Sequence, residues 1–198
     1  ALRLSVGPET PIVARRADAA PWSGRASRES SDVVRRLSGA QTDKERQMSK
    51  MTPGPAIDGV GETSSRIAFG TSGCGADRQE EWHALLDIFA AAGGAMIDTA
   101  RGYGTSEEMV GAWLESRGCR DDMIVQTKCG LTPDCVLPDE DLAAVIRDEL
   151  ALSLDALRTD YIDVFMVHRD NQLKPVGEIL EPLNEAMAGG PVRAIAAS

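Results

Sequence analysis

The chain has 198 residues, of which 42% are hydrophobic, and its formal net charge at pH 7 is -10. This length and composition predict a globular protein of one or two domains. The acidic balance argues against nucleic acid as a partner, because phosphates bind basic surfaces, and no apolar run approaches the roughly 20 residues that cross a membrane.

The first 50 residues differ in composition from the rest. They carry ten Lys or Arg against six Asp or Glu, whereas the remaining residues carry eleven against twenty-five. They are rich in Arg, Ser, Ala and Pro and sustain no apolar period, so they cannot bury enough surface to offset the entropy lost on ordering. We therefore expect 1–60 to be disordered, or to be misassigned coding sequence, and 61–198 to fold.

Strand and helix patterns alternate from residue 67 onward. Short apolar stretches predict strands at 67–70, 95–98, 123–128, 161–168 and 192–197. Amphipathic stretches predict helices at 78–92, at 105–117, from 139 to just before 161, and after Pro175. Gly93 and Gly94 end the first helix, and residues 105–108 fit a capping box at the start of the second. Such repeats predict a parallel α/β sheet.

Three of these strands end in a reactive side chain. Asp98, Lys128 and His168 close the strands at 95–98, 123–128 and 161–168, and Tyr103 follows in the loop after the first of them. Because the carboxyl ends of parallel strands converge on one face, where ligands bind, these four residues are expected to share a pocket. Each of them alone suits an ordinary role in a turn or at a strand end, but together they favour catalysis.

The chemistry of such a pocket follows from its residue types. A phenol has a reference pKa of roughly 10 and is a poor proton donor at neutral pH unless its anion is stabilised. A lysine ammonium can stabilise that anion, a carboxylate can hold the lysine, and a histidine can orient a substrate oxygen. This set would protonate a carbonyl oxygen as hydride reaches the carbon, and the hydride must come from a cofactor.

The cysteines give little sign of function. Cys74, Cys119, Cys129 and Cys135 show no paired spacing of the kind that binds zinc. We therefore predict no metal site, and we expect reduced thiols in a cytoplasmic protein.

Several motifs in register resemble those of the aldo-keto reductases. The stretch 93–107, GGAMIDTARGYGTSE, is similar to the signature segment of that family. Further matches follow in the family's order: Thr127-Lys128, the 153–163 stretch, Val167-His168-Arg169, and VRAIAAS at 192–198. The resemblance implies that Asp98, Tyr103, Lys128 and His168 are the catalytic tetrad, with Tyr103 as the general acid.

The resemblance also implies a fold and a cofactor. The family folds as a (β/α)8 barrel, which typically needs about 250 residues, so this chain is expected to be a C-terminally truncated, weakly stable partial barrel of about five strands and four helices. Its cofactor would be NADPH, with NADH as the alternative. The cofactor-binding residues would include Asp98 and four others: Gly70, Thr71, Ser72 and Ser198.

The expected activity is reduction of small aldehydes or ketones to alcohols. The alternative is a non-catalytic protein, related to the reductases, that binds a partner or senses a nucleotide. Unpaired edges of the sheet also suggest self-association.

Overall fold

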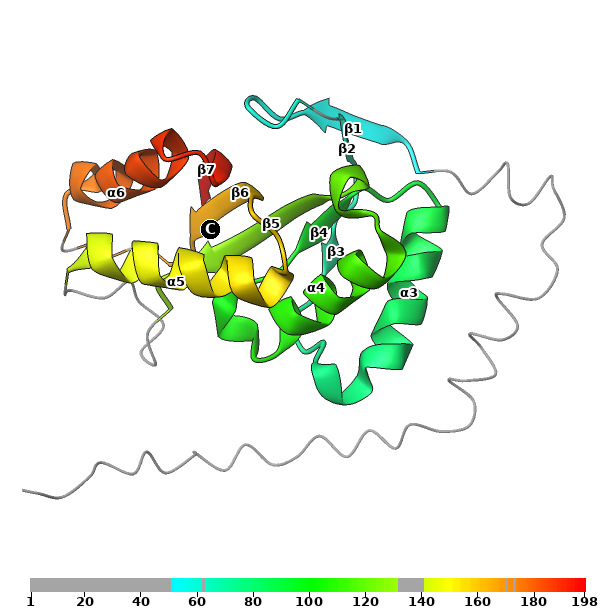
Figure 1. The fold of residues 1–198 in the computed structure, drawn as a ribbon. Coiled ribbons are helices and arrows are strands. Elements are labelled where there is room, and N and C mark those ends of the chain that lie inside the picture. The colour runs from blue at the N-terminus through cyan, green and yellow to red at the C-terminus, as the bar shows by residue number, and fades with distance from the viewer. Residues whose placement is uncertain (1–50, 62, 132–140, 170, 173) are drawn as a thin grey trace, which may run out of the picture. The chain divides into compact units, whose positions relative to one another are not determined.

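The computed structural model describes residues 51–198, except 62, 132–140, 170 and 173 (Figure 1). Five strands form a parallel sheet in which each strand pairs with its neighbour in the sequence. The strands are β3 (Phe69–Gly70), β4 (Met96–Asp98), β5 (Ile124–Cys129), β6 (Ile162–Val167) and β7 (Val192–Ala197). Because all five strands run parallel, their carboxyl ends lie at the same end of the sheet.

Four α-helices connect these strands in alternation. They are α3 (Gln79–Ala91), α4 (Ser106–Arg117), α5 (Leu142–Leu157) and α6 (Val176–Ala188), with short 3-10 turns at η1 (Ala76–Arg78), η2 (Arg101–Tyr103) and η3 (Arg120–Asp122). The predicted order of five strands and four helices is confirmed. The first strand is shorter than predicted and begins at Phe69.

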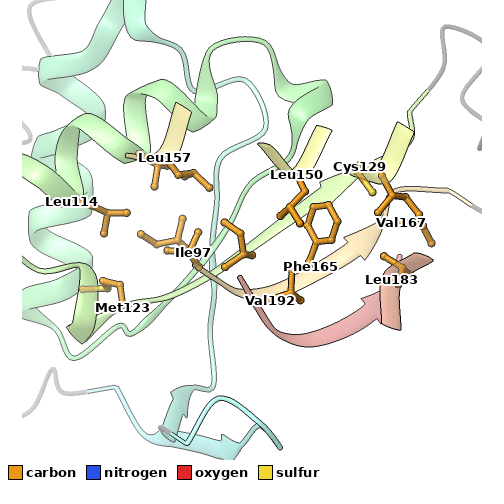
Figure 2. Close-up of a cluster of buried hydrophobic side chains, with 14 of the residues drawn as sticks. Ile97, Leu114, Met123, Cys129, Leu150, Leu157, Phe165, Val167, Leu183 and Val192 are labelled. Atoms are coloured by element: carbon orange, nitrogen blue, oxygen red, sulfur yellow. The ribbon is translucent and has the colours of Figure 1, made fainter. Parts of the chain in front are cut away.

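All four helices pack on the same face of the sheet. Phe165 of β6 is fully buried in one cluster with Leu86 of α3, Leu114 of α4, Leu150 of α5 and Leu183 of α6. Figure 2 labels Phe165 and the leucines of α4, α5 and α6 in this cluster. Burying an apolar side chain of this size contributes roughly 1.5–3 kcal/mol. The alternation of side chains along a strand then directs every second residue to the opposite face.

A hairpin that the sequence did not predict packs against that opposite face. Strands β1 (Pro53–Ala56) and β2 (Thr63–Ser65) pair antiparallel, and Val60 in the turn between them lies in a buried cluster with Ile124 and Val164 of the sheet. The prediction of disorder is therefore wrong for residues 53–60. Local composition carries no strand signal there, and the contact of Val60 with the sheet orders the segment. Residues 1–50 lie outside the described part of the chain.

The sheet has two open edges. Within the described ranges, β3 pairs only with β4 and β7 pairs only with β6. A groove of about 450 Å³ lies beside β7, lined mainly by apolar side chains: Val167, Val176, Ile179, Leu180, Leu183 and Ile195. No helix in the described ranges is both long enough and apolar enough to cross a membrane.

The start of α4 differs from the predicted capping box. Thr105 is the N-cap residue, but its side chain makes no capping hydrogen bond. Its hydroxyl oxygen instead accepts a hydrogen bond of 2.9 Å from the backbone N–H of Ala76. The capping-box prediction is therefore wrong in its contacts, because a tertiary partner takes the oxygen that would have capped the helix.

Candidate active site

The four residues of the expected tetrad come together at the carboxyl ends of the strands. Asp98 is the last residue of β4, Lys128 lies near the end of β5, and His168 directly follows β6. Tyr103 ends the 3-10 turn η2, which follows β4 and leads to α4. Parallel pairing aligns these ends, because Asp98 is in register with Gln126 and Lys128 with Met166.

Lys128 is the centre of the group. Its side chain is 6% exposed, and its ammonium nitrogen donates hydrogen bonds to Asp98 Oδ1 at 2.6 Å and to the Thr99 carbonyl oxygen at 3.0 Å. It also lies 3.3 Å from the Tyr103 hydroxyl oxygen and 4.8 Å from the centre of the phenol ring. A buried ammonium needs such partners, since burial of an unpaired charge is costly. The arrangement places a positive charge beside the phenolic oxygen.

His168 lies beside the same phenol. The two ring centres are 5.3 Å apart and the rings are nearly perpendicular, at 83°. The backbone N–H of His168 donates to the Cys129 carbonyl oxygen at 2.8 Å, which ties the end of β6 to the end of β5. A side chain at Gly102 would crowd this pocket, because its Cβ would lie 2.6 Å from Leu131 and 3.6 Å from His168 Nδ1.

The environment of His168 favours the neutral imidazole. Burial lowers the pKa of His168 below its ordinary value, and the positive charges of Lys128 and Arg169 lower it further, against the opposing effect of Asp98. Its buried Nδ1 has no hydrogen-bond partner among the described residues. A neutral ring has one N–H donor and one acceptor nitrogen, which suits it to bind a substrate oxygen near neutral pH.

We expect this pKa shift to appear in the pH dependence of stability. Because the pKa is lower in the fold than its unfolded value of about 6.5, the unfolded chain binds more protons between the two values. The contribution of His168 to the free energy of unfolding is therefore complete above about pH 6.5, and it is lost as the pH falls through the pKa that His168 has in the folded chain. The free energy of unfolding, measured in urea, should fall more on acidification for the wild-type chain than for the His168→Gln variant. Equal losses in the two chains would contradict the shift.

Three residues to which the sequence assigned no part in the site support the group. Gln126 lies on the same strand face as Lys128 and donates to Asp98 Oδ1 at 2.5 Å. Glu107 is 1% exposed and contacts Arg101 and Thr127. Ser106 Oγ lies 2.8 Å from the carbonyl oxygens of both Tyr103 and Thr71. Only the alternation along β5, which puts Gln126 on the face of Lys128, could have been used to find any of them.

The predicted cofactor-binding residues lie at both edges of the sheet. Gly70 ends β3, Ser72 and Ser198 are exposed, and a Cβ on Gly70 would meet open space. Thr71 is fully buried, and its hydroxyl donates to the Asp98 carbonyl oxygen at 3.0 Å. Thr71 therefore holds the loop after β3 against β4, while its neighbours have exposed surface. In the described ranges, no group of three or more His, Cys, Asp or Glu side chains is arranged to hold a metal ion.

The arrangement has counterparts among known proteins. Residues 66–198 match the model of the "Aldo/keto reductase family". The chain belongs to this family. Among solved structures, the aldo-keto reductase from Klebsiella pneumoniae in complex with NADPH superposes with a TM-score of 0.60 and 25% sequence identity, over 74% of this chain and 50% of that one. The five parallel strands and four helices are thus part of the (β/α)8 barrel of the aldo/keto reductases.

Two curated relatives illustrate the extent of the match. The aldo-keto reductase str7 of Strobilurus tenacellus is 33% identical over 139 residues, which are 65% of this chain and 40% of that protein. An aryl-alcohol dehydrogenase of Phanerodontia chrysosporium, named for NADP(+), is 37% identical over 132 residues, 61% of this chain and 34% of its own length. This chain thus spans about a third to two fifths of the length of these two relatives.

Proposed function

We propose that this chain carries the proton-transfer site of a carbonyl reductase, in which Tyr103 is the general acid. The supporting observation is the position of the Lys128 ammonium nitrogen, 2.6 Å from Asp98 Oδ1 and 3.3 Å from the Tyr103 hydroxyl. A phenol so placed can give its proton to an oxygen that gains negative charge, because the ammonium stabilises the phenolate left behind. The substrate would be a small aldehyde or ketone and the product an alcohol.

Each of the other residues has a definite part in this proposal. Asp98 holds Lys128 in a charge-assisted hydrogen bond, and Gln126 donates a second hydrogen bond to the same carboxylate oxygen, Oδ1. His168, as a neutral imidazole, donates one hydrogen bond to the carbonyl oxygen and orients it toward the phenol. Burial of Lys128 strengthens these electrostatic interactions, since they act in a medium of low dielectric constant.

The cofactor we propose is NADPH, with NADH as the alternative, and when bound it supplies the hydride. The residues at the strand ends fit such a group. The hydroxyls of Ser72 and Ser198 lie on exposed residues, and the backbone at Gly70 is open to close approach. Ser72 and Gly70 would bind it at the β3 edge and Ser198 at the β7 edge, with Asp98 between them.

Two measurements on the purified 198-residue chain test the proposal. NADPH fluorescence is followed as the chain is added, and loss of reduced-nicotinamide absorbance is followed with an aryl aldehyde such as benzaldehyde, chosen because one relative is named an aryl-alcohol dehydrogenase. We expect saturable binding and aldehyde-dependent loss of absorbance. Turnover per chain that rises with protein concentration would indicate self-association through the open edges of the sheet. Binding without turnover would favour the nucleotide-sensing alternative, and absence of both would contradict the proposal for this chain.

A further inference from the structure

The carboxylate of Glu107 joins the two segments that carry the phenol and the ammonium. Its Oε2 accepts a hydrogen bond of 2.5 Å from Arg101, the first residue of η2, and Tyr103 is the last residue of that turn. Its Oε1 accepts a hydrogen bond of 2.6 Å from the hydroxyl of Thr127, which directly precedes Lys128 in β5. One buried side chain therefore binds a neighbour of each reacting group.

The surroundings of Glu107 suit a charged carboxylate. It is the second residue of α4, so it lies in the first helical turn, where the helix dipole favours negative charge. Its side chain is 1% exposed, whereas that of Arg101 is 25% exposed. Both oxygens have a donor, and the arginine supplies the opposite charge that a buried carboxylate requires.

The contact between the Tyr103 hydroxyl and the Lys128 ammonium is too weak to hold these two groups at a fixed distance by itself. At 3.3 Å, the distance between the phenol oxygen and the ammonium nitrogen is beyond the usual range for a good hydrogen bond. Tyr103 is half-buried and lies on a three-residue 3-10 turn, which has little internal hydrogen bonding. The neighbouring framework must therefore hold the phenol in place, and Glu107 is a buried side chain that joins that turn to β5.

We propose that Glu107 is a positioning residue, which clamps η2 to β5 and so sets the distance between the Tyr103 phenol and the Lys128 ammonium. The inference rests on the proposed function, since this distance matters for catalysis only if Tyr103 donates the proton. Its test is nevertheless independent of turnover, because the position of the phenol can be measured directly in the protein without cofactor.

The chain is well suited to that measurement. It contains only two tyrosines and two histidines, so ring signals from labelled Tyr and His are readily assigned by NMR. The perpendicular Tyr103 and His168 rings, with centres 5.3 Å apart, should give a nuclear Overhauser effect between ring protons. Three variants are compared with the wild-type chain: Glu107→Gln, Thr127→Val and, as the control, Asp163→Asn. Asp163 is equally buried, but its partners are Arg120, Arg193 and the backbone N–H of Val125, none of which lies next to Tyr103 or Lys128 in the sequence.

We expect Glu107→Gln and Thr127→Val to fold, by circular dichroism, and to lose the Tyr103 to His168 signal, while Asp163→Asn keeps it. If turnover is found, Glu107→Gln should lower kcat by about 10- to 100-fold with little change in KM, because misplacement of a reacting group slows the chemical step. A signal that persists in folded Glu107→Gln, or one that is absent from the wild-type chain, would overturn the proposal. Failure of both test variants to fold, with Asp163→Asn folded, would overturn it as well, because Glu107 would then be needed for the fold itself.

Discussion

The Tyr103→Phe variant is expected to lose aldehyde-dependent turnover by about 10²- to 10⁴-fold, the range over which a positioned acid accelerates proton transfer. The substitution removes only the hydroxyl, whose oxygen lies 3.3 Å from the Lys128 ammonium nitrogen. The ring itself stays, and with it the perpendicular packing against His168. NADPH affinity should change little, since the residues proposed to bind the cofactor are untouched.

The natural control is the other tyrosine of the chain. Tyr161 precedes β6 at the end of the strand opposite His168, and its hydroxyl donates to Asp121 at 3.0 Å. Tyr161→Phe removes the same group from a site without proposed chemistry, so its turnover should stay near the wild-type value. Absorbance assays of both variants at equal concentration decide the matter. If Tyr103→Phe were as active as Tyr161→Phe, the phenol could not be the general acid.

The largest effect on stability is expected from Gly111→Ala. Gly111 lies in α4 where that helix crosses α5, and a Cβ there would be 2.3 Å from the Ala156 carbonyl oxygen and 2.8 Å from backbone atoms of Leu157. Backbone atoms cannot rotate away as a side chain does, so the two helices must move apart and loosen the core around Leu114 and Leu157. We expect the free energy of unfolding to fall by about 1–3 kcal/mol or more, as in other overpacked cores.

Gly177→Ala provides a matched control for this prediction. Gly177 also lies in a helix, α6, but a Cβ added there meets nothing within 4 Å. Alanine favours the helix over glycine by up to about 1 kcal/mol, so Gly177→Ala should be neutral or stabilising. Urea unfolding followed by circular dichroism compares the two. A Gly111→Ala chain as stable as Gly177→Ala would show that α4 and α5 do not pack this closely.

The regular elements and the four site residues could be predicted from the sequence for a local reason. Strands such as 123–128 and 161–168 are short apolar runs bounded by polar residues, and helices such as 78–92 repeat apolar residues at helical spacing. Because strands in strand-helix repeats run parallel, the side chains at their carboxyl ends lie at the same end of the sheet. The sequence therefore predicts that Asp98, Lys128, His168 and the nearby Tyr103 lie close together.

Contacts between distant segments were decided only in three dimensions. Residues 53–56 lack a strand pattern and are ordered where the turn that follows them buries Val60 against the sheet. The Thr105 hydroxyl oxygen accepts a hydrogen bond from the backbone of Ala76, which is 29 residues away in sequence, and does not cap the helix that follows Thr105. Glu107 resembles a surface residue at a helix start, yet folding buries it between Arg101 and Thr127. The sequence by itself thus determined the elements and the chemistry at the strand ends, because these depend on local periodicity. The partners that hold this chemistry in place depend on which side chains the packed helices and strands bring into contact.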